Sequence, residues 1–85
     1  MSLRILYFAR LREALGVAAE ELEIPDGVSD ILGLMAWLAA RGEVWQQEFA
    51  GCRPLRAAVN QELVSNSAHF KAGDEVAFFP PVTGG

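Results

Sequence analysis

Residues 31–38 carry the apolar spacing of an α-helix, while the segments around them carry strand-like patterns. Ile31, Leu34, Met35 and Leu38 would lie on one side of this helix, and Ser29 or Asp30 can cap its first turn. Strand-like patterns occur at residues 3–8, 19–24, 55–59, 63–65 and 75–79. One apolar helix face among several strands is buried best against a sheet. The pattern therefore predicts an α+β domain, with an antiparallel or mixed sheet covered on one face by the helix.

Turn and helix-end signals separate these segments. Residues 9–15 are good helix formers, and Gly16 is placed to end a short helix there. Gly42 likewise stands where the helix that begins near residue 31 should end, and Glu43–Phe49 should add a further short helix. Asn60-Gln61 between two strand-like runs predicts a tight hairpin, because asparagine tolerates positive φ.

Size and charge restrict the possible functions. The 85 residues make one domain, and with 52% apolar residues the chain has more large apolar surface than so small a core readily buries. The net charge of −4 gives no basic surface for nucleic acid. We expect a cytoplasmic protein, because Cys52 has no disulfide partner and the sequence shows neither a signal peptide nor a membrane span.

Three strand-like runs each contain two adjacent large apolar residues. The pairs are Tyr7-Phe8, Leu63-Val64 and Phe78-Phe79. Neighbours on a strand point to opposite faces of a sheet, so one member of each pair must face away from the covering helix. If the three strands lie side by side, these outward residues make one exposed apolar patch.

The C-terminal segment carries no charge after Glu75. Pro80 and Pro81 cannot continue a strand ladder and favour an extended conformation, so we divide the chain into a domain, residues 1–79, and an extended tail, residues 80–85. At about 3.1 Å per residue such a tail reaches roughly 19 Å. Gly84 and Gly85 have no side chains, so we expect the tail (Pro80, Pro81, Val82, Thr83, Gly84 and Gly85) to enter a narrow channel in another protein and to be unordered without it.

A terminal carboxylate needs activation before it can react. Attack by the Gly85 carboxylate on the α-phosphorus of ATP gives an acyl-adenylate, which a sulfur nucleophile converts to a thiocarboxylate and an amine converts to an amide. A thin, uncharged tail would hold this carboxylate inside a partner's site while the domain docks outside.

No residue inside the domain is a good catalytic candidate. His69 and Cys52 fall in different loops without a third group to orient them, and no spaced set of metal ligands is present. Trp37 and Trp45 are expected to be packing residues. The glutamates of residues 19–24 are expected to form a solvated strand face, namely Glu20, Glu21 and Glu23.

Three stretches of the sequence are similar to the small subunits of molybdopterin synthase. They are Leu6–Glu13, Ala58–Gln61 and the closing Asp74–Gly85, and together the likeness extends over essentially the whole chain. The closing motif is the most specific of them. The resemblance implies a ubiquitin-like β-grasp fold with a C-terminal Gly-Gly tail.

The resemblance also implies a role in molybdenum cofactor synthesis. A partner of the ubiquitin-activating type would adenylate Gly85 with ATP, a sulfur donor system would supply the sulfur of a thiocarboxylate, and no cofactor would be bound permanently. The large synthase subunit would then accept the tail, in a heterotetramer of two large and two small subunits. There the sulfur would pass to cyclic pyranopterin monophosphate and build the molybdopterin dithiolene, so that catalysis belongs chiefly to the large subunit.

The family places Phe8, Leu63 and Phe79 at the partner interface, and these are one member of each apolar pair. Arg10 and Arg12 are either solvated helix charges or partner contacts beside the tail, and Arg12 is included in the expected interface. Two alternatives remain. One is a sulfur carrier for thiamine, which an early strand running into a helix disfavours; the other is a ubiquitin-like modifier or interaction module.

Overall fold

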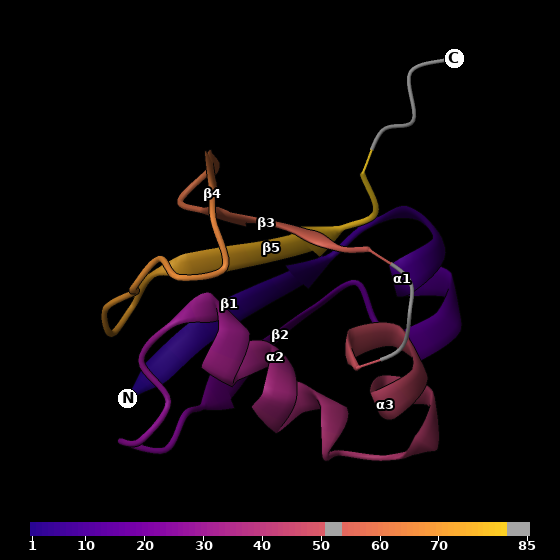
Figure 1. Ribbon diagram of the computed structural model, residues 1–85, viewed down its shortest axis with the longest axis horizontal. Helices are drawn as coiled ribbons and strands as arrows, with labels where there is room; N and C mark the ends of the chain where they lie inside the picture. The colour runs from indigo at the N-terminus through magenta and orange to yellow at the C-terminus, as the bar shows by residue number, and fades with distance from the viewer. Residues whose placement is uncertain (51–53, 82–85) are drawn as a thin grey trace.

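The computed structural model describes residues 1–50 and 54–81 of the chain. Figure 1 shows a sheet with helices beneath it. The elements follow in chain order: β1 (Ser2–Tyr7), α1 (Ala9–Leu15), β2 (Ala19–Glu23), α2 (Ile31–Ala39), α3 (Glu43–Phe49), β3 (Arg56–Val59), β4 (Glu62–Val64) and β5 (Glu75–Phe79). No helix within these described residues is long and apolar enough to cross a membrane.

The sheet is mixed, and its first and last strands are neighbours at its centre. The strand order over the described residues is β2-β1-β5-β3-β4. β1 and β5 run parallel, with Ile5 opposite Val76 and Tyr7 opposite Phe78, while the other pairings are antiparallel. The predicted mixed sheet in an α+β domain is therefore confirmed.

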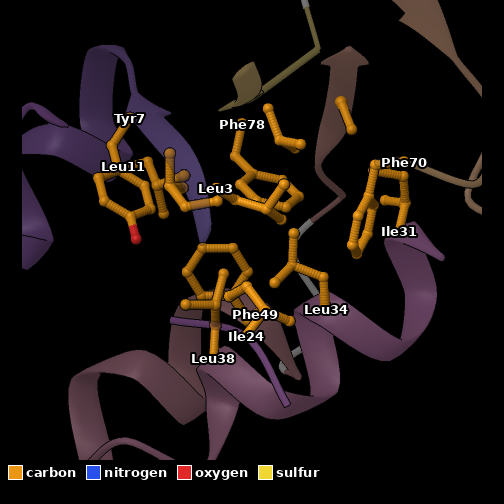
Figure 2. Packing of buried hydrophobic residues seen from close by; sticks show 13 residues of the cluster. Leu3, Tyr7, Leu11, Ile24, Ile31, Leu34, Leu38, Phe49, Phe70 and Phe78 are labelled. Carbon is orange, nitrogen blue, oxygen red and sulfur yellow. The ribbon is translucent and has the colours of Figure 1, made fainter. Parts of the chain in front are cut away.

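One face of the sheet is buried under the helices. The inward residues of β1 meet the apolar stripe of α2, as predicted, and both α1 and α3 add to this layer (Figure 2). The largest fully buried side chains are Tyr7, Phe78, Leu3, Ile5, Leu11, Ile24, Ile31, Leu34, Leu38 and Val76. Trp37 and Trp45 pack against this core, which confirms their expected role.

Asp30 starts α2, but Gly42 does not end it. The Gly33 N–H donates to Asp30 Oδ1 at 2.8 Å, which is the predicted cap. A Cβ at Gly33 would lie only 3.0 Å from that oxygen, so a glycine suits this helical position. The prediction for Gly42 was wrong. α2 ends in a turn whose backbone hydrogen bonds join residues three apart, such as the bond from the Arg41 N–H to Leu38 O at 3.1 Å. Gly42 is instead extended (φ 165°, ψ 179°) and precedes α3.

The predicted turns at Gly16 and Asn60-Gln61 are confirmed. Gly16 is left-handed (φ 73°) and its N–H donates to Arg12 O at 3.0 Å. Asn60 and Gln61 have φ of 51° and 70°, and a two-residue hairpin loop of the favoured type requires positive φ at both positions. The Asn60 side chain also accepts from the Glu75 N–H at 3.0 Å and donates to Asp74 at 3.1 Å. It thereby fixes the β3–β4 hairpin to the start of β5.

Candidate docking face and tail root

The uncovered face of the sheet carries a continuous row of apolar residues. In register across β1, β5, β3 and β4, Leu6 lies opposite Ala77, Ala77 opposite Ala58, and Ala58 opposite Leu63. Leu63 is 60% exposed, whereas the two alanines between Leu6 and Leu63 are buried at the level of the sheet. The surface of the row is therefore recessed at the two alanines and protrudes at Leu63. We call these residues, together with Phe8 and Phe79, the outer-face patch.

Phe8 and Phe79 extend this patch at the end of the sheet where β5 finishes. Phe79 lies opposite Arg56 on β3, and the Phe8 N–H donates to Phe78 O at 3.1 Å, which fixes Phe8 beside β5. Phe8 is 46% exposed and Phe79 is half-buried. Large apolar side chains left uncovered in one place commonly mark a protein-binding surface.

The three apolar pairs divide between the two faces as predicted. Tyr7, Val64 and Phe78 point to the covered face, and their neighbours point to the open one. The strands that carry the pairs are not all adjacent, however, because β3 lies between β5 and β4. The patch is continuous only because β3 contributes Ala58. Strand alternation counted back from Phe8 and Phe79 also indicates Leu6 and Ala77, which were not among the predicted interface residues.

Charged residues border the outer-face patch. Arg4 Nε lies 3.9 Å from Glu75 Oε2 at the start of β5, and Arg56 is exposed beside its end. On α1, Arg10 Nε lies 3.8 Å from the buried Glu48 carboxylate, so Arg10 contributes to packing between α1 and α3. Arg12 is exposed, and its place in a partner interface stays a prediction.

The tail begins beside this patch. β5 ends at Phe79, and the half-buried Pro80 and Pro81 follow at once. Figure 1 shows the chain leaving the end of β5 at the opposite side of the sheet from the N-terminus. The predicted residues Val82, Thr83, Gly84 and Gly85 lie outside the described part of the chain.

A polar network lies under the tail-proximal end of β1. Tyr7 Oη donates to Glu20 Oε2 at 2.7 Å, and Arg41 Nη1 donates to the same oxygen at 2.8 Å. Glu20 therefore lies on the covered face at its rim, and its assignment to a solvated strand face was wrong. Its pairing with Arg41 joins residues 21 positions apart, which a local pattern does not reveal.

The ionisation of this network follows from its contacts. Partial burial alone would raise the pKa of Glu20, but hydrogen bonds from Arg41 and Tyr7 outweigh it and lower the pKa below its ordinary value of 4.5. Burial, followed by the bond to Glu20, raises the pKa of Tyr7 well above its ordinary value. Arg41 also lies 4.2 Å over the Trp45 ring. The phenol thus stays protonated and the carboxylate ionised at neutral pH.

The remaining candidates form no reactive site in the described residues. His69 is exposed in an isolated bridge opposite Asp30, and Cys52 lies outside the described part. No group of three potential metal ligands occurs within residues 1–50 and 54–81. The candidate functional features that the structure brings together are the outer-face patch and the root of the tail.

Comparison with known proteins gives the class and the family. Crystallised SAMP1 from Haloferax volcanii, 26% identical, superposes with a TM-score of 0.78 over 100% of both chains. A complex of subunits 1 and 2 of molybdopterin-converting factor from Helicobacter pylori contains a chain that is 24% identical, with a TM-score of 0.67 over 100% of both chains, which shows the fold alone. The fold is thus the ubiquitin-like β-grasp of small carrier and modifier proteins, as the sequence resemblance implied.

The family assignment rests on the sequence. Residues 5–85 match the ThiS family. A molybdopterin synthase sulfur carrier subunit from Haemophilus influenzae is 41% identical over 83 residues, which cover 98% of this chain and 99% of that one. The chain belongs to the ThiS family, and its predicted likeness to molybdopterin synthase small subunits is confirmed.

Proposed function

We propose that this chain is the sulfur carrier subunit of a molybdopterin synthase. The Gly85 carboxylate is adenylated with ATP by a partner of the ubiquitin-activating type, and a sulfur donor converts the adenylate to a thiocarboxylate. The tail then enters the large subunit, where the sulfur passes to cyclic pyranopterin monophosphate. This chain supplies the sulfur and its positioning, and the large subunit supplies the catalytic groups.

The observation that carries the proposal is the continuity between the outer-face patch and the tail root. Phe79 belongs to both, because it ends β5, lies in the patch and precedes Pro80. A partner that covers Phe8, Leu63 and Phe79 would therefore receive residues 80–85 directly. The name of the Haemophilus influenzae relative supports sulfur as the cargo.

Intact mass tests the cargo and the site together. The chain is incubated with ATP, an adenylating enzyme and a sulfur donor, and we expect one oxygen of Gly85 to be replaced by sulfur. A variant that lacks Gly85 should fold and still bind the large subunit, yet transfer no sulfur to the pterin. Retained synthase activity in that variant would show that Gly85 is not the carrier residue.

A ubiquitin-like modifier is the second candidate, because the superposed SAMP1 structure belongs to a protein also described as a small archaeal modifier protein. This function predicts a different product in the same reaction. The chain would become joined through Gly85 to lysines of other proteins, and no thiocarboxylate would accumulate.

A further inference from the structure

The basic side chains of this protein are almost all arginines. Of its seven basic residues only Lys71 is a lysine. An amine becomes a nucleophile when it loses its proton, whereas a guanidinium stays protonated in proteins. The groups that could form an amide with an activated Gly85 are therefore the Lys71 side chain and the amino group of Met1.

Lys71 lies in the turn that precedes β5. The Lys71 N–H donates to Asp74 Oδ2 at 2.8 Å, and the Asp74 N–H donates back to Lys71 O at 3.1 Å. The Gly73 N–H donates to Ser2 O at 2.8 Å, so the turn is attached to the first residues of β1. The Lys71 turn thus lies where β1 and β5 begin.

The amino group of Met1 is held at the same end. It donates to Ile24 O at 3.0 Å and lies 3.2 Å from Glu23 Oε1. Arg4 is the β1 residue opposite Glu75, so Met1 lies three residues further from the tail than the first residue of β5. Both amines are consequently separated from Phe79 by the length of the parallel strands.

The residues after Pro81 match the distance from Glu75 to Phe79 only when they are fully extended. Glu75 and Phe79 are about 13 Å apart along β5, at about 3.3 Å per residue. The four residues after Pro81 span at most roughly 14 Å when fully extended. Reaching Lys71 would require them to run straight back along the sheet, and a linker that must be fully stretched gives a very low effective concentration.

We propose that the fold protects an activated Gly85 from self-acylation by keeping both of its primary amines at the far end of the β1–β5 pair. This inference rests on the proposed function, since only an activated carbonyl needs protection. The avoided reaction is attack of an amine nitrogen on the Gly85 carbonyl carbon. A C–N bond forms, the bond to the leaving group breaks, and the amine proton passes to the buffer.

Two arginines at opposite ends of β5 provide a matched test. Arg56 lies opposite Phe79, and Arg4 lies opposite Glu75; both are exposed. Arg56→Lys brings an amine to the tail root, while Arg4→Lys makes the same chemical change at the far end. Both are made in a Cys52→Ala background, so that no thiol of the protein competes for the acyl group.

The experiment uses the full chain with Gly85 as a thioester of 2-mercaptoethanesulfonate, dilute and at mildly alkaline pH. Mass spectrometry distinguishes the hydrolysed acid from the cyclised amide, which is one water lighter, and peptide mapping locates the amide. We expect the Arg56→Lys variant to cyclise at least about tenfold faster than either the parent or the Arg4→Lys variant. In urea the parent should cyclise onto Lys71, because unfolding removes the separation.

Two outcomes would overturn the proposal: native parent protein that cyclises onto Lys71 or Met1 as fast as the Arg56→Lys variant, or equal rates for the two lysine variants. The thioester is made chemically, so these results do not depend on the adenylating enzyme. Failure of the proposed function would show separately, as the absence of a thiocarboxylate at Gly85 when the unmodified chain meets ATP, that enzyme and a sulfur donor.

Discussion

At the scale of single residues, adjacent phenylalanines have opposite roles. Phe78 is fully buried and meets Phe49 edge to face, with ring centroids 5.2 Å apart, whereas Phe79 faces the open side of the sheet. Strand alternation alone produces this difference, because the two side chains leave opposite faces of β5.

The pair can be separated experimentally. Phe78→Ala should destabilise the domain by about 3–5 kcal/mol through loss of core packing. Phe79→Asp should cost about 1 kcal/mol of folding stability but should greatly weaken binding to the large subunit. Urea unfolding and calorimetric titration measure the two effects. If the Phe79→Asp variant is unfolded, Phe79 is a core residue and the docking face has been misplaced.

At the scale of elements, the stability of α2 depends on the capping of its ends and on its packing against the sheet. Its nine residues contain no charged side chain, so it has no surface ion pairs to support it. Asp30 satisfies the Gly33 N–H in its first turn.

Removing this cap should therefore be measurable. Asp30→Ala is expected to lower the free energy of unfolding by about 1 kcal/mol, whereas Asp26→Ala, at an exposed turn position, should change it by less than about 0.5 kcal/mol. Thermal and urea unfolding of both variants check this. Equal effects would mean that the loss reflects a general change of charge near α2.

Features set by local sequence could be predicted, and features set by strand order could not. The Asp30 cap, the Asn60-Gln61 hairpin and the outward member of each apolar pair follow from short-range geometry. The position of Ala58 within the patch depends on β3 entering between β5 and β4. Gly42 was misassigned because a glycine after a helix fits two connections equally well, and only the placement of α3 decides between them.

At the scale of the whole molecule, the network of Tyr7, Glu20 and Arg41 joins three parts of the chain. It connects β1, β2 and the link between α2 and α3, directly beneath the end of the sheet that carries Phe8.

This network makes stability depend on pH. The pKa of Glu20 is lower in the folded state than its ordinary value of 4.5, so its contribution is complete above that pH and is lost as the pH falls through the folded-state value. Glu20→Gln should thus cost about 1 kcal/mol at pH 7 and less at pH 3, which lies below the ordinary pKa of the carboxyl. Urea unfolding at both pH values measures this. A difference between parent and variant that grows on acidification would contradict the assigned sign.

The central position of β5 has a consequence for biosynthesis. Residues 75–79 fill the space between β1 and β3, so the two halves of the sheet join only when this last strand arrives. A nascent or clipped polypeptide that stops before Glu75 lacks the strand that joins β1 to β3. Each of these two strands then has an unpaired edge, which favours aggregation and proteolysis. Every correctly folded molecule consequently already possesses the strand from which the proposed carrier tail extends.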